Sequence, residues 1–172
     1  VDPGKKITIP LIAWLLYDGN EYLLVDTGGT PADGIHYMPY TQAPGCTLQE
    51  QLYVHGVAPE NIKTVIMTHL HWDHAGNNGL FQNARFYVQQ RELDYARSPL
   101  KIQKNAYNKD LVFKTEYIAL NGSAEIADGI SVVPTPGHSP GSQSVIVNTA
   151  KGPYIIVGDL ICLYACMERD PM

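Results

Sequence analysis

The stretch THLHWDHAG, residues 68–76, constrains the fold of this chain more than any other feature. It places three histidines and an aspartate directly after KTVIM, a run rich in β-branched residues that predicts a strand. Side chains two positions apart on an extended backbone point to the same side, so His69 and His71 are expected to lie together. A metal ion accepts neutral ring nitrogens and a carboxylate as ligands. We therefore predict a metal site at the end of this strand, in preference to a purely structural cluster.

Two distant motifs also place polar side chains at predicted strand ends. TPGHSPGS, residues 135–142, carries His138 between glycines and prolines, which allow a tight loop that aims one imidazole. VGDL places Asp159 after an apolar strand, where an unpaired carboxylate would be costly. Asp26, at the end of YLLVD, is interpreted as a residue that orients a ligand and does not itself bind the metal.

The first half of the chain mixes predicted strands and helices. We expect strands over 7–17 and 21–26, joined by the turn at 18–20, and a Pro- and Gly-rich loop over 31–46. Thr47 and Glu50 form a capping box that starts a helix, and Gly56 ends it. Further expected elements are a strand at 63–67, a weak helix at 75–81, a strand at 84–89 and a helix at 90–96.

The second half of the chain is predicted to consist mostly of strands. Residues 98–114 are polar with scattered aromatics and are interpreted as a surface insertion or a lid. The expected strands are 117–120, 129–134, 142–148 and 153–159. This order favours an α/β (α+β) fold with mixed sheets over a regular βαβ repeat.

VDTG, HLHWDH, TPGHSPGS and VGD, in this order and spacing, resemble the metallo-β-lactamase superfamily over nearly the whole chain. The resemblance implies one domain over residues 1–172, a four-layer αββα sandwich with the metal site at one edge. It assigns six metal ligands: His69, His71 and His138 for one ion, Asp73 and His74 for a second, and Asp159 as the bridge between the two.

The end of the chain departs from the family pattern. Members supply a last histidine ligand well downstream of the bridging aspartate, whereas this sequence stops thirteen residues after Asp159. It also begins at Val1 without a methionine, so we expect truncation at both ends and a partly open second metal site. The expected cofactors are two divalent ions, with zinc preferred and with iron, manganese or cobalt acceptable to the same ligands.

Such a site predicts a hydrolase. Metal binding lowers the pKa of water from 15.7 to about 7, and two ions roughly 3.5–4 Å apart share a bridging hydroxide that attacks an ester or lactone carbonyl. Within the superfamily, THLHWDHAGN and the loop after VDTGG are most similar to the N-acyl-homoserine lactonases. The resemblance therefore implies hydrolysis of N-acyl-homoserine lactones, which is quorum quenching.

Candidate catalytic and substrate-binding residues follow from the same resemblance. Asp73 is expected to relay a proton, and a tyrosine shortly after the bridging aspartate to hydrogen-bond the substrate. The familiar spacing places Cys162 at that position, with Tyr164 two residues later as the candidate. An acyl pocket is suggested for four residues that equally fit a role in loop packing: Met38, Tyr40, Tyr107 and Phe113.

Two alternative functions remain open, and composition bears on the kinds of partner. A glyoxalase-type thioester hydrolase is the closest enzymatic alternative, and a non-catalytic metal-binding fragment is the alternative from another class. A net charge of −5 without Lys/Arg clusters argues against nucleic-acid partners. ITIPLIAWLLYD is too short to span a membrane. The three cysteines show no paired spacing, which favours reduced thiols in a cytoplasmic protein, and a homodimer is compatible with the sequence.

Overall fold

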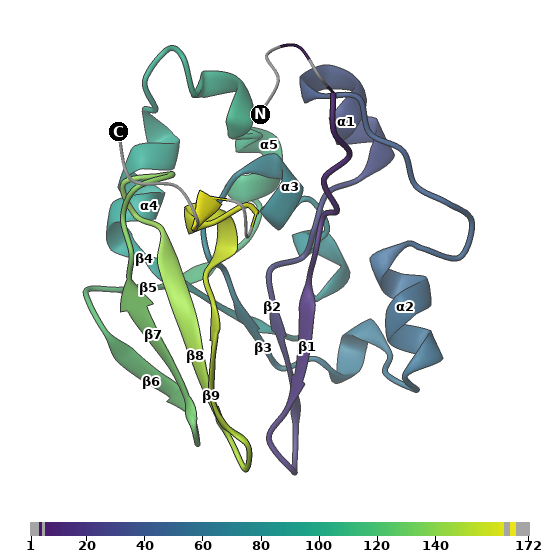
Figure 1. Cartoon of the computed structure of the whole chain (residues 1–172), viewed down its shortest axis with the longest axis vertical. Coiled ribbons are helices and arrows are strands. Elements are labelled where there is room, and N and C mark those ends of the chain that lie inside the picture. The colour runs from purple at the N-terminus through teal and green to yellow at the C-terminus, as the bar shows by residue number, and fades with distance from the viewer. Residues whose placement is uncertain (1–3, 5, 164–165, 168–172) are drawn as a thin grey trace.

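The computed structural model describes residue 4, residues 6–163 and residues 166–167, and within them two β-sheets pack face to face (Figure 1). The first sheet has the order β1-β2-β3-β4-β5. Its first two strands are antiparallel and the others are parallel to their neighbours. The bounds are β1 Trp14–Tyr17, β2 Tyr22–Val25, β3 Thr64–Ile66, β4 Arg85–Gln89 and β5 Tyr117–Leu120.

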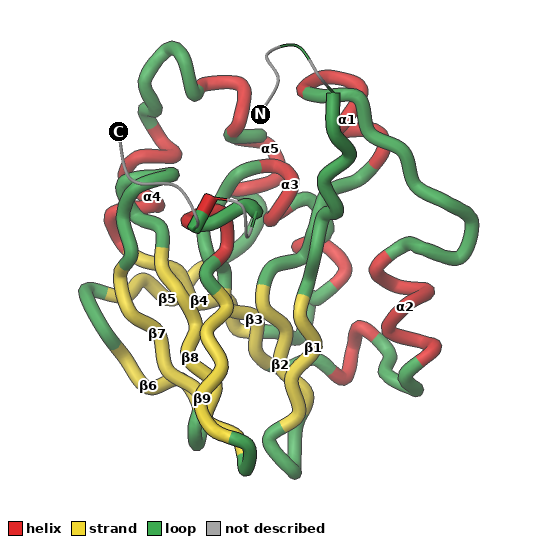
Figure 2. The backbone as a smooth tube through the Cα atoms, in the orientation of Figure 1, coloured by secondary structure: helices red, strands yellow, loops and turns green. Residues whose placement is uncertain are grey.

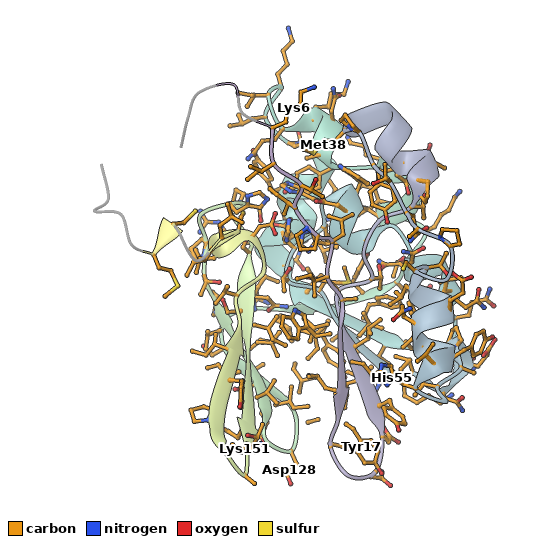
Figure 3. The ribbon with its side chains drawn as sticks, turned by 45° about the vertical axis from the view of Figure 1, so that its right-hand side comes forward. Lys6, Tyr17, Met38, His55, Asp128 and Lys151 are labelled. Carbon is orange, nitrogen blue, oxygen red and sulfur yellow. The ribbon has the colours of Figure 1, made fainter. Side chains whose placement is uncertain are left out.

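The second sheet is antiparallel throughout, in the order β6-β7-β8-β9. Its strands are β6 Ala124–Ala127, β7 Ile130–Pro134, β8 Gln143–Thr149 and β9 Gly152–Ile156. The hairpin turns of both sheets point to the same end of the molecule, where Figure 3 labels Tyr17, Asp128 and Lys151. The longer loops that carry the polar motifs lie at the opposite end.

The helices are short. They are α1 Pro31–Tyr37, α2 Leu48–Val54, α3 Trp72–Ala75, α4 Gln90–Arg97 and α5 Lys109–Val112, with 3₁₀ turns at Pro59–Asn61, Asn78–Leu80, Lys104–Ala106 and Gly158–Leu160. The predicted capping box of α2 is confirmed, because Thr47 and Glu50 exchange both bonds. None of the helices in the described ranges has both the length and the apolar character needed to cross a bilayer.

Two apolar cores lie on the two faces of the first sheet. Leu24, Val65 and Val88 face the helices and pack in one cluster with residues such as Phe81 and Leu93. Leu23, Val25 and Ile66 point the other way and pack against the second sheet. Neighbouring residues of β2 thus enter opposite cores, because successive side chains on a strand point to opposite faces.

The predicted fold class is confirmed as a mixed α/β sandwich of two sheets, and the described residues form three of its four layers. All five described α-helices precede β5 in the chain, and they lie beside the first sheet or beyond the strand ends (Figures 1 and 2). On the outer face of the second sheet, Ile155 is 61% exposed. The second helical layer is not formed by the residues that the structure describes.

Two predictions for the region before residue 47 were wrong in extent. The strand expected over 7–17 begins only at Trp14. The loop expected over 31–46 contains helix α1, because Thr30 accepts a hydrogen bond from the backbone N–H of Asp33. Pro31 supports this start, since the first helical position does not need the N–H that proline lacks.

Three later predictions also need correction. The weak helix expected at 75–81 lies earlier, as α3, and is followed by a 3₁₀ turn. Strand β6 was missed, because AEIA carries little β-propensity and forms a strand by pairing with β7. Residues 98–114 are more than a surface insertion, since Tyr107 and Val112 are buried in the helix-side core.

Candidate metal centre

The polar motifs meet at one end of the sandwich, where several strands finish. The loop after β3 carries His69 and His71, and helix α3, which follows it, carries Asp73 and His74. The loop after β7 carries His138, and the turn after β9 carries Asp159. The ligand atoms of His69, His71 and His138 all lie within 4.8 Å of one another. Those of His69, His74 and Asp159 form a second group of the same size. His55, in contrast, follows α2 and lies away from this end (Figure 3).

Asp26 organises two of these imidazoles through its carboxylate. One oxygen accepts from the backbone N–H of Thr68 at 2.7 Å, and the other accepts from the Thr68 hydroxyl at 2.7 Å and from His74 Nδ1 at 2.8 Å. Because an ionised carboxylate only accepts, His74 must donate from Nδ1. The Thr68 hydroxyl, having donated its proton, accepts from His69 Nδ1 at 3.1 Å. Both rings therefore carry a proton on Nδ1, which leaves Nε2 as the atom that can bind a cation.

The buried nitrogens of the cluster test whether a metal fits. Among the described residues, His69 Nε2 and His71 Nε2 are buried and have no hydrogen-bond partner. Such atoms are rare in folded proteins and call for an explanation such as an ion. His71 Nδ1 also approaches His138 Nε2 to 2.9 Å, at a point where two basic nitrogens converge. Imidazole nitrogens in this arrangement suit a divalent cation such as zinc.

Electrostatics keep two of the histidines neutral and therefore ready to bind a cation. Burial, reinforced by the neighbouring histidines, lowers the pKa of His69 well below its usual value. Burial and His138 lower the pKa of His71 to about 3. A metal would not have to displace a proton from either ring near neutral pH.

Asp159 lies between the two groups. One of its oxygens is 3.2 Å from His74 Nε2 and the other is 3.4 Å from His138 Nε2. Burial disfavours the charged forms of both His74 and Asp159. Even so, Asp26 and Asp159 raise the pKa of His74 well above its usual value, and His74 lowers the pKa of Asp159. A carboxylate so placed can hold two cations at once or, without them, a proton on His74.

Asp73 is near the second group but outside it. Its nearer carboxylate oxygen is 3.9 Å from His74 Nε2, and its side chain is partly buried. Burial raises the pKa of Asp73, although His74 partly offsets this effect. The carboxyl group is therefore suited to accept and return a proton.

Close backbone approaches hold these loops in place. Asp26 itself has a positive φ of 59°, the only such value at a described residue other than glycine. Gly158, with φ of 55°, lies so near Thr68 that an added Cβ would be 2.8 Å from that side chain. Gly29 leaves similar room for the ring of Trp72. The glycines of VDTGG and VGD thus allow three strand ends to meet.

The four residues suggested for an acyl pocket are dispersed. Tyr107 is buried and its ring lies 4.6 Å from that of His71. Met38 and Phe113 are exposed. Tyr40 lines a cavity of about 500 Å³ whose walls come from β1, α2 and the segment joining α1 to α2, and none of the six candidate ligands is part of that lining.

The segment after Asp159 is described only in part. Tyr164, the candidate for substrate binding, lies outside the described residues. Cys162, at the position that the family spacing indicates, is exposed, and its thiol is 3.5 Å from the backbone oxygen of Asp159.

Glu92 was not identified by sequence reasoning, although it is completely buried beside the candidate site. It lies in α4 and hydrogen-bonds to both histidine-bearing loops. QRELDYA is an ordinary amphipathic sequence, and only the tertiary structure brings this carboxylate to the loops.

Comparison with known proteins places the chain in a family. The model of the metallo-beta-lactamase superfamily matches residues 13–171. The chain belongs to this superfamily, in agreement with its two-sheet fold and with the group of histidines and aspartates at the strand ends.

The similar proteins carry a more specific name. The N-acyl homoserine lactonase AttM of Azorhizobium caulinodans is 36% identical over 177 residues, covering 91% of this chain and 66% of the relative. An N-acyl homoserine lactonase of a Bacillus species is 31% identical over 169 residues, covering 91% and 66%.

Solved structures agree in fold. A variant of B. thuringiensis AiiA with N-decanoyl-L-homoserine at its active site superposes with a TM-score of 0.80 and 29% identity, covering 92% of this chain and 67% of that protein. An N-acyl homoserine lactone hydrolase with N-hexanoyl-L-homoserine at its catalytic metal centre gives 0.80 and 28%, with the same coverage. The chain spans about two thirds of the length of the curated relatives that it matches.

Proposed function

We propose that this chain is the metal-binding part of a hydrolase that opens the lactone ring of N-acyl homoserine lactones. The observation that carries the proposal is the pair of ligand groups that share His69, with Asp159 between His74 and His138. Its relatives named as N-acyl homoserine lactonases support the choice of substrate.

The proposed centre holds two divalent ions, with zinc as the preferred metal. In this assignment His69, His71 and His138 would hold one ion, Asp73 and His74 would hold the second, and Asp159 would be shared by both. The unpartnered Nε2 atoms of His69 and His71 favour metal binding over a structural role for the histidines.

Bound cations would supply a Lewis acid for the lactone carbonyl and lower the pKa of water to about 7. The protein's own part is to hold neutral imidazoles and to move protons. His69 and His71 stay neutral because burial lowers their pKa values. Asp73, whose pKa is raised by burial, is placed to take a proton from water and return it to the alkoxide that leaves when the ring opens.

Exposed apolar side chains are the candidates for contact with the acyl chain of the substrate. The side chains of Met38, Phe113 and Leu160 are exposed, and we propose that some of them contact the acyl chain, together with Tyr164.

The exposed free thiols of Cys46, Cys162 and Cys166 support a reducing, cytoplasmic location.

The test is hydrolysis of N-acyl homoserine lactones by the zinc-loaded 172-residue chain, followed by proton release, with S-lactoylglutathione as the competing substrate. We expect kcat/KM to favour the lactones by a wide margin. His69→Ala and Asp159→Ala should abolish turnover, while His55→Ala, a histidine far from the centre, should leave it unchanged. The opposite substrate ranking would favour a thioester hydrolase, and turnover that survives both substitutions would contradict the assignment.

A further inference from the structure

Glu92 carries a buried charge that the proposed reaction does not use. Its side chain is fully shielded from solvent, and no cation lies within ion-pair distance of it among the described residues. Four donors compensate the carboxylate. One oxygen accepts from Leu70 N at 3.0 Å and from the Tyr107 hydroxyl at 3.0 Å, and the other accepts from Ser139 Oγ at 2.5 Å and from Gly141 N at 3.2 Å.

Three of the four donors lie next to candidate ligands of the first ion, and the fourth, Gly141, lies in the same loop as His138. Leu70 stands between His69 and His71, and Ser139 directly follows His138. Tyr107 packs the edge of its ring against His71. The Glu92 carboxylate thus joins the loop after β3 to the loop after β7. The strands that precede these two loops belong to different sheets.

The contact between α4 and the loop after β7 is also very close. A Cβ added to Gly141 would lie 2.1 Å from the backbone nitrogen of Glu92, so no side chain fits there. The loop is held against the helix by this contact and by two hydrogen bonds to the carboxylate. Its position therefore depends on the start of α4.

We propose that Glu92 is a positioning residue, which sets the separation of His138 from His69 and His71 and thereby the affinity of the first metal ion. The inference rests on the proposed metal centre. A buried carboxylate is destabilising unless donors surround it, and all four donors to this one lie on or beside the ligand loops. Residues that orient metal ligands typically change metal affinity by about 10- to 100-fold when they are replaced.

The experiment compares zinc affinity and fold in matched variants of the whole chain. Glu92→Gln keeps the shape of the side chain but turns an NH₂ group, which can only donate, toward two groups that now donate to the carboxylate. We expect this variant to bind zinc at least tenfold more weakly, as measured by chelator competition. Tyr107→Phe removes one hydrogen bond to Glu92, and Ser139→Ala removes one to Glu92 and one to Ser142. We expect each variant to lose about threefold in zinc affinity. Glu125→Gln, an exposed glutamate on β6, should match the parent chain.

Cobalt absorption supplies a readout that general destabilisation would not move. In folded Glu92→Gln, the visible bands of bound cobalt should shift in position and intensity, because the three imidazoles no longer converge as before. Unchanged bands with zinc affinity within threefold of the parent would overturn the proposal. If Glu92→Gln fails to fold, Ser139→Ala decides, and zinc affinity within twofold with unchanged bands would overturn it as well.

The parent chain separates this inference from the proposed function. If the parent chain binds no zinc, the proposed metal centre fails and the role of Glu92 fails with it. If the parent binds zinc and the variants bind it equally well, only the role of Glu92 is wrong.

Discussion

Asp26→Asn should weaken metal binding without removing any side chain that ligates the metal. The backbone N–H of Thr68 points at one carboxylate oxygen and can only donate, so the amide oxygen of the substituted side chain must take that place. The NH₂ group then faces the Thr68 hydroxyl and His74 Nδ1. Both partners must become acceptors, which reverses the donor pattern around His69 and His74.

The reversal places protons where lone pairs are needed. His74 would accept at Nδ1 and carry its proton on Nε2, and the Thr68 hydroxyl would donate to His69 and impose the same tautomer there. To bind a cation through Nε2, each ring must give up one hydrogen bond worth about 1 kcal/mol. Two rings cost about 2 kcal/mol, which corresponds to roughly 30-fold in affinity.

The assay is chelator competition for zinc, combined with nitrogen NMR of the histidine rings, which reports the tautomers directly. Asp33→Asn is the matched control, because Asp33 also accepts from a threonine hydroxyl, at 2.6 Å, but lies in α1. We expect the control to bind zinc like the parent. If Asp26→Asn shows Nδ1-protonated His74 and zinc affinity within threefold of the parent, the reasoning about tautomers is refuted.

Three further predictions concern stability. Phe81→Ala should lower the free energy of unfolding by about 3–5 kcal/mol in urea, because the ring is fully buried in the helix-side core. Gly158→Ala should cost about 1–3 kcal/mol in the same assay and weaken zinc binding, because φ is 55° and the new Cβ would overlap a threonine side chain. Without metal, the protein should lose stability as the pH falls below about 6.5, because the lowered pKa values of His69 and His71 make the unfolded chain bind more protons there. His74 acts in the opposite direction but at higher pH, since its raised pKa adds stability as the pH falls toward 6.5 and adds no more below it. A free energy of unfolding that stays constant or rises between pH 6.5 and about 5 would therefore contradict the prediction.

Local patterns predicted those elements whose causes are local. The capping box of Thr47 and Glu50 appears as expected, since its bonds join residues three apart. Strand β3 appears because its β-branched residues fit a fully buried strand. Strand β6 was missed because AEIA has little preference of its own, and α1 because its capping bond lies within a segment that reads as a loop.

In the candidate site as well, motifs predicted some of the residues, and the tertiary structure decided where the others lie. Spacing and chemistry singled out His69, His71 and His138 as possible partners, and the structure brings their ligand atoms within 4.8 Å. The suggested acyl-pocket residues had no such motif, and they are dispersed, with Tyr107 buried and Met38 exposed.

The sequence alone determined which residues are candidate ligands, the strands that precede them and the superfamily, because these depend on residue type and on spacing along the chain. Only the tertiary structure decided the state of each ligand. The tautomers of His69 and His74 depend on a carboxylate more than forty residues away, at Asp26. The separation of the two histidine loops depends on Glu92, whose hydrogen bonds reach forward to Ser139 and back to Leu70. Such contacts are set by the packing of two sheets, which no local pattern encodes.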